Sequence, residues 1–113
     1  MLEGKVRFQV KTPFDLVVRT THEYWRFITA SKHPIIKVYE GEVKETLKSP
    51  DEIRLSRKDE KVFLFYKRYK NLGNRYICVL IKRLNGDGFI ITAYMADNVK
   101  RGKIVWKKSP KRS

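Results

Sequence analysis

Alternating and fully apolar runs along the chain predict a protein built mainly of β-strands. Residues 5–10 alternate between polar and apolar side chains, which is typical of a half-exposed strand. A second short strand is expected over 14–19, after the break at Thr12-Pro13, so residues 5–19 are a predicted hairpin. Four further strands are expected over 53–56, 62–69, 75–83 and 89–95, and their short connections favour an antiparallel meander.

Two helices are predicted between the hairpin and the meander. Thr20 and Glu23 have the spacing of a capping box, and the apolar stripe after them predicts a helix to about Ser31. Pro34 ends this helix, and residues 38–48 are expected to form the second. The predicted fold is α+β, with two N-terminal helices packed on one face of a four-stranded antiparallel sheet and the opposite face open to a ligand.

The strand that ends at Met95 is the most informative of the predicted strands. Because side chains alternate between the faces of a strand, Thr92 and Tyr94 are expected to share one face with Ile90. The other face is wholly apolar and consists of Phe89, Ile91, Ala93 and Met95. Two hydroxyls on an otherwise core-like strand of a cationic protein suggest contact with a phosphate.

Composition adds a strong positive charge to this picture. The 113 residues, expected to form one domain with a basic tail over about 107–113, include 26 Lys and Arg against 12 Asp and Glu, a formal net charge of +14. This imbalance favours a polyanionic partner such as RNA, DNA or an anionic membrane surface. With 42% hydrophobic residues the chain has enough apolar material for a core, which argues against disorder.

The single cysteine and the hydropathy profile indicate where such a protein works. Cys78 is the only cysteine, which excludes an internal disulfide and a cysteine-rich metal site and fits a reducing compartment. We recognise no signal peptide, and no apolar run approaches about 18 residues. A cytoplasmic protein without a membrane anchor is expected.

The positive charge is concentrated in two stretches without acidic residues. These stretches are 61–86, with Lys61, Lys67, Arg68, Lys70, Arg75, Lys82 and Arg83, and 98–113, with Lys100, Arg101, Lys103, Lys107, Lys108, Lys111 and Arg112. Four tyrosines on which bases can stack alternate with these cations, although strand tyrosines also serve as core residues: Tyr66, Tyr69, Tyr76 and Tyr94.

The candidate chemistry requires neither a metal nor a cofactor. Metal-ligand spacings and glycine-rich phosphate loops are missing from the sequence. His33 is a candidate proton-transfer group, or alternatively a cap for the last carbonyls of the first helix. Ser56 and Arg54 share a face if their strand is regular, although Ser56 and Asp59 also fit a polar turn. RNA cleavage suits these groups, because the 2′-hydroxyl is an internal nucleophile.

Several segments together resemble the small phage-type nucleases of the barnase–EndoU–colicin–RelE group. The resemblance extends from about residue 5 to residue 107 and rests on Tyr24-Trp25, Lys32-His33-Pro34, Val43-Lys44-Glu45-Thr46-Leu47, Pro50-Asp51-Glu52-Ile53-Arg54, Phe65-Tyr66, Gly88-Phe89-Ile90-Ile91-Thr92-Ala93-Tyr94 and Lys100-Arg101-Gly102-Lys103-Ile104-Val105-Trp106. It implies N-terminal helices before a four-stranded antiparallel sheet. It also implies a metal-independent ribonuclease, often a toxin controlled by an antitoxin protein.

Carried over residue by residue, the resemblance implies a catalytic set of His33, Arg54, Thr92 and Tyr94. The expected substrate-binding residues are Ser56, Tyr66, Lys67, Arg68 and Lys82, with Arg54 and Lys67 as the phosphate clamp. Many relatives carry a second histidine soon after the tryptophan, where this chain has Arg26-Phe27-Ile28. A single-histidine site would take Tyr94, Lys67 or water as its second proton-transfer group.

Three hypotheses follow for the function. The first is a metal-independent endoribonuclease without cofactors, the toxin of a toxin–antitoxin pair, with RNA as substrate and a small acidic antitoxin as partner. The second is a non-catalytic RNA- or DNA-binding module that uses the same cationic face. The third is an interaction protein that binds an acidic partner through that face.

Overall fold

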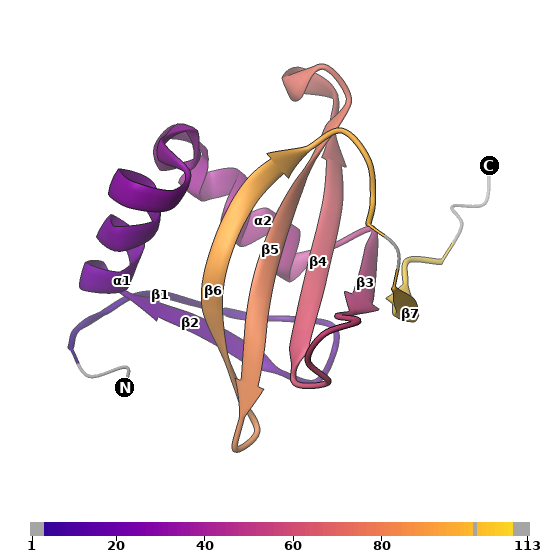
Figure 1. The fold of residues 1–113 in the computed structure, drawn as a ribbon, viewed down its shortest axis with the longest axis horizontal. Coiled ribbons are helices and arrows are strands. Elements are labelled where there is room, and N and C mark those ends of the chain that lie inside the picture. The colour runs from indigo at the N-terminus through magenta and orange to yellow at the C-terminus, as the bar shows by residue number, and fades with distance from the viewer. Residues whose placement is uncertain (1–3, 101, 110–113) are drawn as a thin grey trace.

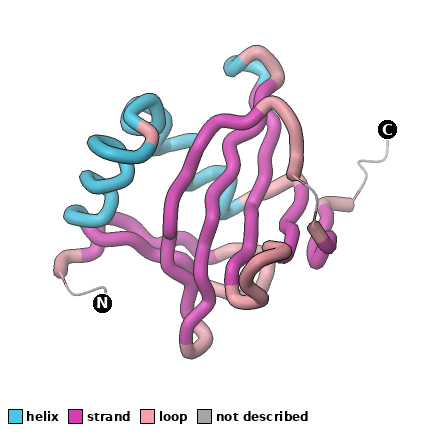
Figure 2. The backbone as a smooth tube through the Cα atoms, viewed as in Figure 1, coloured by secondary structure: helices cyan, strands magenta, loops and turns pink. Residues whose placement is uncertain are grey.

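The part of the chain that the computed structural model describes, residues 4–100 and 102–109, contains one seven-stranded sheet (Figures 1 and 2). Its strands lie in the order β1 (Val6–Lys11), β2 (Val17–Thr21), β6 (Asp87–Ala96), β5 (Arg75–Leu84), β4 (Val62–Tyr69), β3 (Glu52–Leu55) and β7 (Lys103–Lys107). Neighbouring strands are antiparallel except β2 and β6, which are parallel. The α+β class is confirmed.

The sheet is larger than the predicted one. Strands β3 to β6 are the expected antiparallel meander, but the hairpin of β1 and β2 joins it beside β6, and β7 joins it beside β3. The segment around Trp106 is therefore a strand, although only an apolar anchor was expected there. Arg101 and residues 110–113, with much of the predicted basic tail, lie outside the described residues.

The helical region begins one residue later than predicted. Thr21, and not Thr20, is the N-cap of α1 (His22–Phe27), because its hydroxyl accepts a hydrogen bond from the Tyr24 N–H at 3.1 Å. Thr20 still pairs with Phe8 in the hairpin. A π-helical turn (Ile28–Lys32), a 3₁₀ helix (Pro34–Tyr39) and α2 (Glu40–Lys48) follow. None of the described helices is long and apolar enough to span a membrane.

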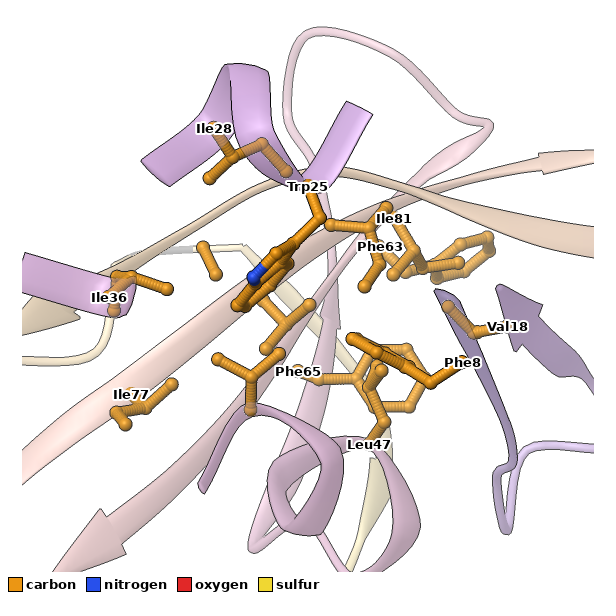
Figure 3. Close-up of a cluster of buried hydrophobic side chains, with 14 of the residues drawn as sticks. Phe8, Val18, Trp25, Ile28, Ile36, Leu47, Phe63, Phe65, Ile77 and Ile81 are labelled. Carbon is orange, nitrogen blue, oxygen red and sulfur yellow. The ribbon is translucent and has the colours of Figure 1, made fainter. Parts of the chain in front are cut away.

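The two α-helices contact different parts of the sheet and share one core. Helix α2 lies behind β4 and β5, whereas α1 packs on the hairpin (Figure 1). Phe8 and Trp25 meet edge to face, with ring centroids 5.6 Å apart, and so tie the hairpin to α1. Figure 3 shows the centre of this core, where the labelled side chains are Phe8, Val18, Trp25, Ile28, Ile36, Leu47, Phe63, Phe65, Ile77 and Ile81.

A β-bulge in β6 overturns the predicted division of its side chains. Ile81 pairs with Ile90 and Leu80 pairs with Thr92, so Ile91 is an extra residue on β6. Ile90 therefore lies in the core, 2% exposed, on the face opposite Thr92 and Tyr94. The prediction that Ile90 shares their face, and Phe89 the other, assumed unbroken alternation and is wrong.

The contact between β2 and β6 generates a prediction about glycine. A Cβ on Gly88 would lie 2.9 Å from Val18 Cγ2 and 3.1 Å from Leu16 Cδ2, whereas a Cβ on Gly41, in α2, would meet no atom within 4 Å. Gly88→Ala should lower the free energy of unfolding by about 1–3 kcal/mol through overpacking. Gly41→Ala should raise it by about 0.5–1 kcal/mol, because alanine favours the helix. Urea denaturation measures both, and equal effects would contradict the close packing.

Candidate functional site

The α-helices leave one face of the sheet uncovered (Figure 1). The centre of this face is apolar. Tyr66, Cys78 and Tyr94 lie directly opposite one another on β4, β5 and β6. Leu64, Leu80 and Thr92 form the next row along the same strands, and Arg54 of β3 pairs with Leu64. We call this surface the open face. Thr92, Tyr94 and Arg54 of the predicted catalytic set therefore share one side of the sheet.

His33 reaches the open face from the helical layer. Its backbone N–H donates to the Ile28 carbonyl at 2.9 Å, and its carbonyl accepts from the Ile36 N–H at 3.0 Å. The residue is thereby fixed between the π-helical turn and the 3₁₀ helix, both of which contact β6. Its ring centroid lies 5.5 Å from that of Tyr94. The backbone, and not the imidazole, caps the preceding helical turn.

A pocket of about 330 Å³ opens on this face beside Tyr94. Leu64, Leu80 and Tyr94 contribute its apolar lining from three adjacent strands. The polar lining comes from two connecting segments: the turn after β3, with Ser56, Arg57 and Lys58, and the segment between β6 and β7, with Lys100. Three cations therefore surround an apolar, partly aromatic surface.

Two hydrogen bonds attach the segment between β6 and β7 to the sheet. The Lys100 N–H donates to the Tyr66 hydroxyl at 3.1 Å, and the Arg54 guanidinium donates to the Gly102 carbonyl at 3.2 Å. Gly102 is required here, because a Cβ would lie 2.7 Å from the Leu55 carbonyl oxygen. Lys100 Nζ is consequently held 5.4 Å from the centroid of the Tyr94 ring.

Tyr94 meets the pocket with its ring and not with its hydroxyl. The hydroxyl oxygen is buried and has no hydrogen-bond partner among the described residues, and the same holds for Thr92 Oγ1. Burial, together with the neighbouring Cys78, raises the pKa of the Tyr94 hydroxyl. Tyr94 therefore stays neutral at physiological pH. It offers an aromatic surface to a ligand and is a poor general base.

Arg54 and Tyr66 hold the site together. The Arg54 guanidinium forms an ion pair with Glu52 and also donates to the Gly102 carbonyl. Two of its five N–H donors are therefore used within the protein. Tyr66 is fully buried, and its hydroxyl accepts the Lys100 N–H. Both residues position the wall of the pocket in this structure.

The structure does not bring all the predicted binding residues together. Lys67 points to the helix-covered face, where its Nζ donates to the Ser49 carbonyl at 2.9 Å. Arg68 lies on the open side beyond the Tyr66 row, with its Cζ 5.5 Å from the Tyr76 ring centroid. Lys82 lies near the opposite end of the strands, 3.5 Å from Asp59.

Ser56 lines the pocket, but its hydroxyl accepts the Lys58 N–H at 3.2 Å, as in the polar turn considered from the sequence. Arg57 and Lys58, the cations of this turn, were not predicted as site residues, and neither was Lys100. In the sequence they stand out only as cations in a polar turn and in a basic stretch. Their approach to Tyr94 depends on the paths of two connecting segments, which local patterns do not predict.

The described residues include no group of three or more His, Cys, Asp and Glu positioned to hold a metal ion.

Comparisons with protein-family models, curated proteins and solved structures find no match to this chain. The resemblance to the barnase–EndoU–colicin–RelE group therefore stays a prediction from the residues quoted for it. The function has to be argued from the geometry of the open face.

Cys78 generates a prediction about alkaline pH. Burial between Tyr66 and Tyr94 raises the pKa of its thiol from 9.0 to about 11. The unfolded chain therefore ionises first as the pH rises, and the free energy of unfolding should fall between about pH 9 and pH 11. Cys78→Ala should show a smaller fall over this range, measured by urea denaturation at successive pH values. Parallel declines in the two proteins would contradict the buried, neutral thiol.

Proposed function

We propose that the chain binds single-stranded RNA on the open face and cleaves it as an endoribonuclease. The observation that carries the proposal is the approach of His33, from the helical layer, to Tyr94 beside a pocket surrounded by cations. A titratable imidazole, an aromatic surface and fixed positive charge are the groups that RNA cleavage without a cofactor requires.

The lining of the pocket supports RNA as the substrate class. The Tyr94 ring, Leu64 and Leu80 offer an apolar surface on which a nucleobase can stack. Arg57, Lys58 and Lys100 supply the charge that attracts the phosphates on either side of such a base. A base must leave its own stack to reach this surface, which favours single-stranded over double-stranded RNA.

In the proposed reaction the 2′-hydroxyl of the substrate attacks the adjacent phosphorus. The P–O5′ bond breaks, leaving a 2′,3′-cyclic phosphate on one fragment and a 5′-hydroxyl on the other. His33 either accepts the proton of the attacking 2′-hydroxyl or donates a proton to the leaving O5′. The pocket cations stabilise the negative charge of the transition state. Lys100 replaces Lys67 as the candidate second proton-transfer group, because Lys67 faces the other side of the sheet.

The positive charge of the open face also suits an acidic protein partner. Carboxylates of a small acidic protein would bind the cations of the open face and cover the pocket. The net charge of +14 favours such a partner. We therefore extend the proposal to the toxin component of a cytoplasmic toxin–antitoxin pair, with this acidic protein as the antitoxin.

A non-catalytic RNA-binding module is the second candidate. It is favoured by the burial of the Thr92 and Tyr94 hydroxyls and by the internal pairing of Arg54. These observations leave His33 as the principal candidate for catalysis. RNA binding without cleavage would favour the non-catalytic module over the ribonuclease.

Incubation of purified protein with total cellular RNA in excess EDTA tests the proposal. The protein should cleave RNA in the presence of the chelator, and His33→Ala should reduce the rate by about 100-fold or more. The variant should keep its melting temperature and its affinity for a short single-stranded RNA, because His33 does not line the pocket. Intact RNA with the wild-type chain, or undiminished cleavage by His33→Ala, would overturn the proposed mechanism.

A further inference from the structure

A second pocket, of about 400 Å³, lies in the helical layer and shares no lining residue with the pocket on the open face. Its lining combines β1, α1, the π-helical turn and the 3₁₀ helix, with Arg7, His22, Trp25, Arg26, Thr29 and Lys37. Four of these six side chains are basic. None of the described residues that line the pocket carries a carboxylate.

One of the four basic groups is already balanced and is held in place. Arg7 donates two hydrogen bonds to the carboxylate of Glu40, at 2.7 and 2.8 Å. This pairing lowers the pKa of Glu40, so the carboxylate is ionised and neutralises the guanidinium. Arg7 also donates to His22 Nδ1 at 3.3 Å, which places the imidazole proton on Nε2. Arg7 still has unused N–H groups in a fixed orientation.

Two of the other basic groups, Arg26 and Lys37, are not balanced. Arg26 and Lys37 come from α1 and the 3₁₀ helix, and neither forms a salt bridge within the described part of the chain. The Thr29 hydroxyl donates its only proton to the Trp25 carbonyl at 3.0 Å, so it has no donor left for an anion. Two net positive charges therefore converge on a pocket whose third cation is oriented by Glu40.

We propose that this pocket binds a phosphate group. A phosphate monoester carries between one and two negative charges at neutral pH, which Arg26 and Lys37 would neutralise. The unused N–H groups of Arg7 and the Nε2–H of His22 would add donors to its oxygens. Free phosphate and the terminal phosphate of a nucleic acid both present the group that this pocket would bind. The site is independent of RNA cleavage on the open face.

Nuclear magnetic resonance on the isotopically labelled, full-length chain tests this proposal. Inorganic phosphate, added at an ionic strength kept constant with sodium chloride, should shift the resonances of the His22 imidazole and the Trp25 indole in a saturable way. The indole of Trp106, on β7, serves as an internal reference and should stay in place. The lack of a saturable shift, or an equal shift in sodium chloride alone, would overturn the proposal.

Matched charge variants test the assignment to this pocket. Arg26→Gln with Lys37→Gln should weaken phosphate binding by about tenfold or more. Lys44→Gln with Lys48→Gln removes the same charge from α2, outside the pocket, and should leave the affinity unchanged. The single variant Lys37→Gln, at an exposed position, repeats the test if the first pair disturbs the fold. Equal losses in the two double variants would overturn the assignment.

Two dinucleotides that differ only in a 5′-phosphate or a 5′-hydroxyl separate the sources of the phosphate. Tighter binding of the phosphorylated dinucleotide than of inorganic phosphate would identify a nucleic-acid terminus as the ligand. Equal affinities would identify the phosphate group alone. Binding of the 5′-hydroxyl dinucleotide with the same shifts at His22 would contradict recognition of a terminal phosphate. These experiments measure binding and not cleavage of RNA. Their outcome is therefore independent of whether the ribonuclease proposal holds.

Discussion

The pairing of β5 with β6, interrupted by one extra residue at Ile91, is the constraint on which the candidate site depends. Before the bulge, Ile90 enters the core, and after it Thr92 and Tyr94 face the opposite side. A strand without the bulge would carry all three on one face, and either the core would lose an isoleucine or the open face would lose its tyrosine. The position of Tyr94, and with it the pocket, follows from this register.

Burial on the open face determines which chemistry its groups can support. The Tyr66–Cys78–Tyr94 row is apolar enough to raise the pKa of all three groups, which therefore stay neutral. Tyr66 and Cys78 are fully buried, so the Tyr94 ring is the part of this row that a base could contact. Positive charge comes instead from the two connecting segments that carry Arg57, Lys58 and Lys100. The sheet thus supplies the apolar surface, and the connecting segments beside it supply the positive charge.

Much of the fold follows from local patterns. The strand expected over 62–69 has these bounds in the structure, and the strand expected over 75–83 ends one residue later. Their long apolar runs left little ambiguity. The parallel contact of β2 with β6 was not predicted, because it pairs residues 70 positions apart without a local signal. The N-cap at Thr21 was missed because two adjacent threonines offer the same side chain.

The candidate site was predictable only in part. His33 and Tyr94 were selected from the sequence and lie together, with ring centroids 5.5 Å apart. Lys67 was assigned to the phosphate clamp, although strict alternation along β4 places it beside Phe65 on the covered face. Lys100 depends on a tertiary hydrogen bond from its backbone to Tyr66, which no spacing in the sequence encodes.

The central claim is that RNA binds the open face, and a pair of lysines on opposite sides of the sheet tests it most directly. Lys100→Ala and Lys67→Ala each remove one positive charge, so the net charge of the two variants is the same. Affinity for a short single-stranded RNA is measured over a range of salt concentrations. We predict that Lys100→Ala weakens binding and reduces the slope of log K against log salt by about 0.7, while Lys67→Ala matches the wild-type chain. Equal effects of the two substitutions would show that binding follows net charge and would contradict a site on the open face.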